Sequence, residues 1–127
     1  MKMKKTIRTL AMAGLILGLG TSTVLAGSVS NIWTTPCHSF MGVLNTFSGK
    51  TAEASTTIKG GNKSVNAYVY VEGVDENGYR QGTPTEDYGT PTAFASTYAY
   101  KATLFNSRHT VKDPQCKNYY FQLRAEN

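Results

Sequence analysis

The sequence lacks the short motifs that mark common catalytic sites. It contains no G-x-S-x-G nucleophile turn, no H-E-x-x-H pair of metal ligands and no phosphate-binding P-loop. Each of these chemistries needs its residue types at a fixed spacing, and none of those spacings occurs here. We therefore expect a protein that acts by binding and is not an enzyme.

Long apolar runs are also missing. Four basic residues among the first eight precede a short apolar run at 10–19, and Val24 to Ala26 offers residues tolerated at a cleavage site. This order is typical of a secretory signal peptide, and the run is shorter than the ~18 residues of a transmembrane helix. We expect cleavage after Ala26, which removes residues 1–26 and exports residues 27–127 as one domain, without stable membrane insertion.

The exported part carries little excess charge. The whole chain has 13 Lys and Arg against 8 Asp and Glu, but four of the bases and none of the acids lie in residues 1–26. Nine bases then face eight acids, a net charge of +1. A nucleic-acid partner requires a substantial basic surface, so we exclude one.

Cysteine is scarce: Cys37 and Cys116 are the only two. In an exported protein an even number predicts a disulfide first. This bond would close about 80 residues, hold the segment with Trp33 onto the last strand and stabilise the fold by about 4 to 5 kcal/mol.

Two other uses of these cysteines can be drawn. Together with His38 and His109 they could form a Cys2His2 zinc site, but structural zinc ligands usually come as close pairs such as C-x2-C, which the sequence lacks. A Cys37 nucleophile with His109 as its base would need a free thiol in an oxidising compartment. We predict the Cys37–Cys116 disulfide, with no metal and no other cofactor.

Alternation of polar and apolar residues predicts strands along the exported chain. The expected strands are 52–58, 65–71, 79–83, 92–105, 110–112 and 118–125, with a strand or helical turn at 32–44. Tight turns are expected at Gly60 to Asn62, joining two strands as a hairpin, and at Asn77-Gly78, as type I′. Residues 82–92 read as a loop and 106–109 as a turn. The pattern predicts an all-β fold, a small antiparallel β-sandwich of about six to eight short strands.

Two of these strands have unlike faces. In 92–105 one face is mostly alanine and threonine, with Lys101, and the other consists of Phe94, Ser96, Tyr98, Tyr100, Ala102 and Leu104. Because aromatic side chains bury more apolar area, we expect the aromatic face in the core. In 65–71 the aliphatic face is expected in the core, which leaves Tyr68 and Tyr70 outward.

Charge is distributed unevenly along the chain. Acids concentrate in residues 72–87, without the spacing of a calcium loop, and bases dominate after residue 98. Such a dipolar chain can present its basic part to an anionic envelope or to the acidic loop of a second copy. The candidate binding residues are therefore Tyr68, Tyr70, Lys101, Arg108 and Lys112.

The C-terminal 80 or so residues carry further features. They include Ala93-Phe94-Ala95, Lys101-Ala102-Thr103 and the aromatic run Tyr119-Tyr120-Phe121. After a cleaved signal, these features resemble the lactococcin-type secreted bacteriocins of Gram-positive bacteria. The resemblance implies a β-sandwich that acts on cell-wall precursors of competing cells. The chain departs from that pattern in its length and its two cysteines, and no functional residue is transferred.

We expect a secreted, non-enzymatic binding protein that acts at the bacterial cell envelope, in a bacteriocin-like antimicrobial role. Its partner would be an envelope component or a surface protein. The alternative is a structural or adhesive surface protein that assembles with copies of itself, which alternating strands and opposite regional charges permit.

Overall fold

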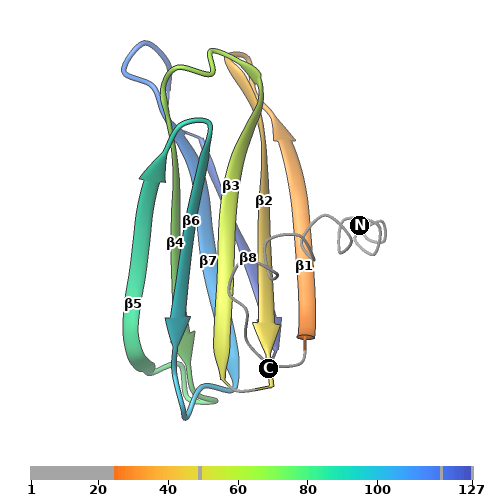
Figure 1. The fold of residues 1–127 in the computed structure, drawn as a ribbon, viewed down its shortest axis with the longest axis vertical. Coiled ribbons are helices and arrows are strands. Elements are labelled where there is room, and N and C mark those ends of the chain that lie inside the picture. Colours follow the sequence, from red (N-terminus) through yellow and green to blue (C-terminus); the bar gives the residue numbers. More distant parts are fainter. Residues whose placement is uncertain (1–24, 49, 118, 127) are drawn as a thin grey trace.

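The computed structural model describes residues 25–48, 50–117 and 119–126. Within these ranges eight strands form two antiparallel sheets that pack face to face, as Figure 1 shows. The described ranges hold no helix with the length and apolarity to cross a membrane. The predicted small β-sandwich is confirmed. The expected export signal falls outside the described residues except for Leu25 and Ala26.

The strands divide equally between the two sheets. The first sheet has the order β1-β2-β3-β6 and the second β5-β4-β7-β8. Their bounds are β1 Leu25–Thr34, β2 His38–Phe47, β3 Thr51–Gly61, β4 Asn66–Val74, β5 Arg80–Gly89, β6 Thr92–Tyr98, β7 Leu104–Lys112 and β8 Tyr120–Glu126.

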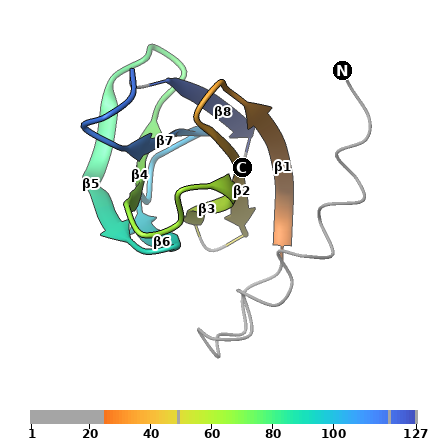
Figure 2. The same cartoon turned by 90° about the horizontal axis from the view of Figure 1, so that it is seen from above.

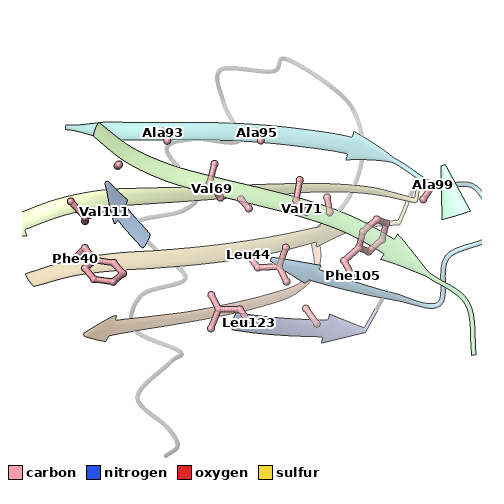
Figure 3. Packing of buried hydrophobic residues seen from close by; sticks show 14 of the residues in the cluster. Phe40, Leu44, Val69, Val71, Ala93, Ala95, Ala99, Phe105, Val111 and Leu123 are labelled. Carbon is pink, nitrogen blue, oxygen red and sulfur yellow. The ribbon is translucent and has the colours of Figure 1, made fainter. Parts of the chain in front are cut away.

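The core lies between the inner faces of the sheets. Figure 3 shows Leu44 of β2 and Val69 and Val71 of β4 among the side chains that fill this space. As predicted for 65–71, the aliphatic face of β4 is fully buried, while Tyr68 and Tyr70 lie on the opposite side and are half-buried.

The open edges of the two sheets come together. The Thr97 hydroxyl of β6 donates to the carbonyl oxygen of Thr83 in β5 at 2.6 Å. At the other side β1 packs against β8, and the Thr46 hydroxyl of β2, the strand next to β1, donates to the carbonyl oxygen of Glu126 in β8 at 3.0 Å. Seen from above in Figure 2, the strands form a nearly closed ring. Each sheet edge therefore faces another strand, which protects it from pairing with a second chain.

The expected strand 92–105 ends at Tyr98, and its expected orientation is wrong. Ala93, Ala95 and Ala99 are buried, whereas Tyr98 and Tyr100 are 60% and 68% exposed. The reason is spacing: a Cβ added at Gly73 of β4 would lie only 2.6 Å from the Cβ of Ala99. Only small side chains fit where the sheets approach this closely, so steric fit overrides the larger area an aromatic face would bury.

Two expected connections are also wrong. Residues 106–109 are not a turn but the middle of β7, where inward Ser107 and His109 alternate with outward Asn106 and Arg108. Polar residues in the core concealed this period-2 pattern. Residues 82–92 are largely β5, an edge strand that accommodates Gly82 and Pro84 at a register shift.

The turns differ from expectation as well. Gly60 to Asn62 does not close a hairpin, because β3 and β4 lie in different sheets and face each other across the core. Asn77-Gly78 does join the paired strands β4 and β5, but only Gly78 has a positive φ, of 85°. The turn is therefore not type I′: it is a four-residue turn from Asp75, whose carbonyl oxygen accepts from the Gly78 N–H at 2.9 Å, followed by a left-handed glycine.

The predicted disulfide is confirmed. Cys37 and Cys116 are bonded, with their Cα atoms 6.5 Å apart and a separation of 79 in sequence number. Beside the bond, Nε2 of His38 lies 3.1 Å from Oδ2 of Asp113, and both side chains are buried. The bond holds the β1–β2 turn to the segment before β8. Close to it in sequence, the ring of Trp33 in β1 packs on the ring of Phe121 in β8, with centroids 5.9 Å apart.

Removing the disulfide should destabilise the fold strongly. In the variant Cys37→Ser with Cys116→Ser, the unfolded chain regains the freedom of a long loop, at a cost of about 4 kcal/mol. We expect the melting temperature, followed by circular dichroism without reductant, to fall by about 10 °C or more. A fall of less than about 3 °C would show that the bond contributes little.

His109 is a polar residue at the centre of the core, with no exposed surface. The Thr56 hydroxyl donates its proton to the carbonyl oxygen of Tyr68 at 2.8 Å, so it accepts from Nδ1 of His109, also at 2.8 Å. Nε2 then accepts from the Ser107 hydroxyl at 2.6 Å. Burial lowers the pKa of His109 to about 3, and the ring is held neutral.

This histidine should make stability depend on pH. Because its folded pKa lies below the unfolded value near 6.5, its contribution is present above pH 6.5 and is lost as pH falls toward about 3. Between pH 7.5 and 4.5 we expect His109 to contribute a loss of about 3 kcal/mol to the free energy of unfolding, measured with urea as the difference in pH dependence between the parent and a variant without this histidine.

The variant His109→Gln isolates this effect, because every other titrating group stays in place. These include Glu53, whose raised pKa acts in the opposite direction. An equal change in the free energy of unfolding of the variant and the parent over this pH range would contradict the assignment.

Candidate binding surface

Tyrosines and cations gather on the outer face of the second sheet. We call this surface the tyrosine–cation face. It consists of Tyr68 and Tyr70 of β4, Tyr88 of β5, Arg108 and Lys112 of β7, and Tyr120 of β8. All six occupy outward positions because each strand turns its alternate residues into the core.

One row of this face crosses all four strands. Tyr68 is the register partner of both Tyr88 and Thr110, and Thr110 is the partner of Tyr120. The rings of Tyr68 and Tyr88 contact each other, with centroids 4.9 Å apart. Tyr88 and Tyr120, at the ends of the row, are 52% and 56% exposed, so aromatic surface faces solvent there.

Two cations lie over these rings. The guanidinium carbon of Arg108 is 5.7 Å from the ring centroid of Tyr70 and 5.6 Å from that of Tyr120, and Nζ of Lys112 is 5.1 Å from the centroid of Tyr68. Cations at this distance are attracted by the ring quadrupole. Neither takes part in the two side-chain ion pairs found among the described residues. Both charges are therefore available to an anionic ligand.

Carboxylates fix the two central tyrosines. The Tyr68 hydroxyl donates to Glu86 at 2.7 Å, and the Tyr70 hydroxyl donates to Glu72 at 2.9 Å. Burial, reinforced by these carboxylates, raises the pKa of both phenols. Arg80 pairs with Glu72 at 3.2 Å and holds that side chain in turn. The rings are thus set in position before any ligand arrives.

The face is hollowed at the aromatic row. A shallow depression of about 440 Å³ is lined by Tyr68, Tyr88, Arg108, Thr110, Lys112 and Tyr120. Three of its lining residues are tyrosines and two are cations. Such a surface suits a ligand with flat or apolar groups and a negative charge, for example a polymer of sugars or polyols bearing phosphate or carboxylate.

Four of the five candidate binding residues lie together on this face. Lys101 does not: it is exposed in the turn after β6, where the Ala102 N–H donates to the carbonyl oxygen of Ala99. Lys112 lies at one end of β4, where it is the register partner of Asn66. Lys101 lies near the other end of β4, because the N–H of Thr103 donates to the carbonyl oxygen of Val74 there. The sequence interpretation missed Tyr88 because its strand was read as a loop. Tyr120 could have been found from the alternation in the last strand.

The residues considered for zinc or nucleophilic chemistry are used otherwise. Cys37 and Cys116 are bonded to each other, His38 pairs with Asp113, and His109 lies in the core. In the part of the chain that the structure describes, no three His, Cys, Asp or Glu side chains group so as to hold a metal ion.

Comparisons of the chain with models of protein families, with curated proteins and with solved structures found no match.

Proposed function

We propose that this chain is a secreted, non-enzymatic protein that binds an anionic component of the bacterial cell envelope through its tyrosine–cation face, in a bacteriocin-like antimicrobial role. The observation that carries the proposal is the coincidence of an exposed aromatic row with two unpaired cations on one sheet face. The disulfide is compatible with an extracellular protein.

The chemistry of the face supports an anionic ligand. Sugar or polyol units can pack on the exposed rings of Tyr88 and Tyr120. Arg108 presents a planar donor group suited to phosphate or carboxylate, while Lys112 supplies a second positive charge near the same row. Envelope polymers of bacteria combine these two properties.

The polar groups that would be needed for catalysis lie elsewhere. Thr56, Ser107 and His109 form a hydrogen-bonded set, but their side chains are buried in the core and out of reach of a substrate. This arrangement supports binding over catalysis as the role of the surface.

The alternative, a structural or adhesive protein that assembles through sheet edges, receives less support. β5 faces β6, and β1 faces β8, so added strands would have to displace contacts within the domain. Association through a sheet face remains open to such a protein.

The proposal predicts that the two cations and the aromatic row carry the binding. Protein secreted from the full-length precursor would be mixed with isolated cell walls of Gram-positive bacteria, and the bound fraction measured by co-sedimentation. Arg108→Gln with Lys112→Gln should weaken binding about tenfold or more, and added salt should weaken the parent protein in the same direction. Tyr88→Ala with Tyr120→Ala should have a comparable effect.

Two variants serve as matched controls. Lys101→Gln removes an exposed positive charge outside the face, and Tyr100→Ala removes an exposed ring there; both should bind like the parent. Undiminished binding by the Arg108 and Lys112 double variant would show that the ligand site is not on this face.

A further inference from the structure

The hollowed surface of the second sheet continues past the tyrosine–cation face. Lys112 and Asn66 are register partners at one end of the pair of strands β4 and β7. Beyond them lies another depression, of about 590 Å³, which we call the end depression. Ser64 and Asn66 line it on the side of β4, and Lys112, Pro114 and Cys116 line it on the side of β7. Because Lys112 lines both hollows, the end depression adjoins the depression at the aromatic row.

Positive charge flanks the end depression. Lys63 directly precedes Ser64, and Lys117 directly follows Cys116; both lysines are exposed. Figure 1 shows the β3–β4 and β7–β8 connections, which carry them, at the same end of the sandwich. Neither lysine takes part in the ion pairs found in the described part of the chain. Two further cations are therefore available next to Lys112.

The one carboxylate in the lining of the end depression is already engaged. Oδ2 of Asp113 lies 3.1 Å from Nε2 of His38, and its Oδ1 accepts from the N–H of Gln115 at 2.9 Å. Asp113 is also buried. The charge that this end offers to a ligand is therefore positive.

The opposite end of the same sheet has the opposite charge. A depression of about 660 Å³ there is lined by Glu72, Asp75, Glu76 and Glu126, with Arg124 as the cation in its lining. Glu72 pairs with Arg80, so three carboxylates remain against one arginine. A negatively charged chain bound at the aromatic row is repelled from this end and attracted toward the end depression.

The cations follow the direction of one strand. Arg108, Thr110 and Lys112 occupy successive outward positions of β7, so the Cα atoms of the two cations are about 13 Å apart. Tyr68 and Tyr120 are the register partners of Thr110 on either side. A chain lying along β7 would pass between these two rings and meet a cation at each end of the row.

We propose that the ligand of the tyrosine–cation face is a linear polyanion that lies along β7 and continues over Lys112 into the end depression, where Lys63 and Lys117 bind further negative charges of the same chain. This inference rests on the proposed function and adds to it the form of the ligand and a second subsite.

The polar groups of the end depression suit such a chain. Oδ1 of Asn66 accepts from the Thr90 hydroxyl at 2.5 Å, which leaves the amide N–H groups of Asn66 to donate to phosphate, carboxylate or hydroxyl oxygens. The Ser64 hydroxyl donates to Asn62 at 2.6 Å and keeps its capacity to accept from a hydroxyl of the ligand. Polyol phosphates and chains of uronic acids both present these groups at regular intervals.

Two adjoining subsites make affinity depend on the length of the ligand. Once one charged group is bound between Arg108 and Lys112, the next group of the same chain reaches Lys63 and Lys117 at a high effective concentration. Short fragments that occupy only the aromatic row lack this gain. Length dependence therefore separates a second subsite from a general attraction of the protein to anions.

The test uses protein secreted from the full-length precursor and poly(glycerol phosphate) in fractions of increasing length, with binding measured by titration calorimetry. Lys63→Gln with Lys117→Gln should raise the dissociation constant of the long chains about tenfold and make its dependence on salt less steep. Binding of the shortest fragments should be unchanged, because they occupy only the aromatic row. Polygalacturonate, measured in parallel, shows whether carboxylates can replace phosphates.

A matched control removes the same number of positive charges elsewhere. Lys101→Gln with Arg124→Gln should leave the dissociation constant of the long chains within about twofold of the parent value. All four substituted side chains are exposed, and melting curves followed by circular dichroism verify that both double variants fold.

The outcomes distinguish this inference from the proposed function. If Arg108→Gln with Lys112→Gln weakens binding but Lys63→Gln with Lys117→Gln does not, the face binds its ligand and the second subsite is wrong. Equal weakening of short and long chains by the Lys63 and Lys117 variant would also overturn the subsite. If neither polymer binds the parent protein, the inference fails, and binding to whole cell walls then decides the proposed function separately.

Discussion

The close approach of the two sheets is the constraint on which the rest of the structure depends. A Cβ placed on Gly42 would lie 2.5 Å from Cγ of His109, and one on Gly73 would meet Ala99 and Ala102. At these points backbone packs directly on side chain, so only small residues fit there. This spacing assigns alanines to the core and turns Tyr98 to the surface. Aromatic area is thereby left on the outside of the molecule.

The consequence is a domain with two chemically different outer faces. The second sheet exposes rings and cations, and the ring positions are fixed by carboxylates that accept from the phenols. The first sheet carries Asn45 and Glu53, which are already buried within the single chain. Because the strands close nearly into a ring, the sheet edges face strands of the same chain and are protected from pairing with another chain.

The ends of the sandwich are held by a different device. The Cys37–Cys116 bond joins the β1–β2 turn to the segment before β8, and the Trp33 ring lies against Phe40 and Phe121 close in sequence to it. A core made largely of Ala and Val gains limited free energy from burial, so a covalent link between its first and last parts matters more than in a larger domain.

Local alternation and composition were enough for the sequence by itself to determine an all-β fold, the inward face of Val69 and Val71, the outward Tyr68 and Tyr70, and the disulfide. Each depends on the period of the side chains or on a count of two cysteines. Only the tertiary structure decided which face of 92–98 is buried, that 106–109 is strand, and that Tyr88 and Tyr120 join Arg108 and Lys112. These depend on the distance between the sheets and on strand order, and both arise from contacts between residues far apart in the chain, which no local pattern encodes.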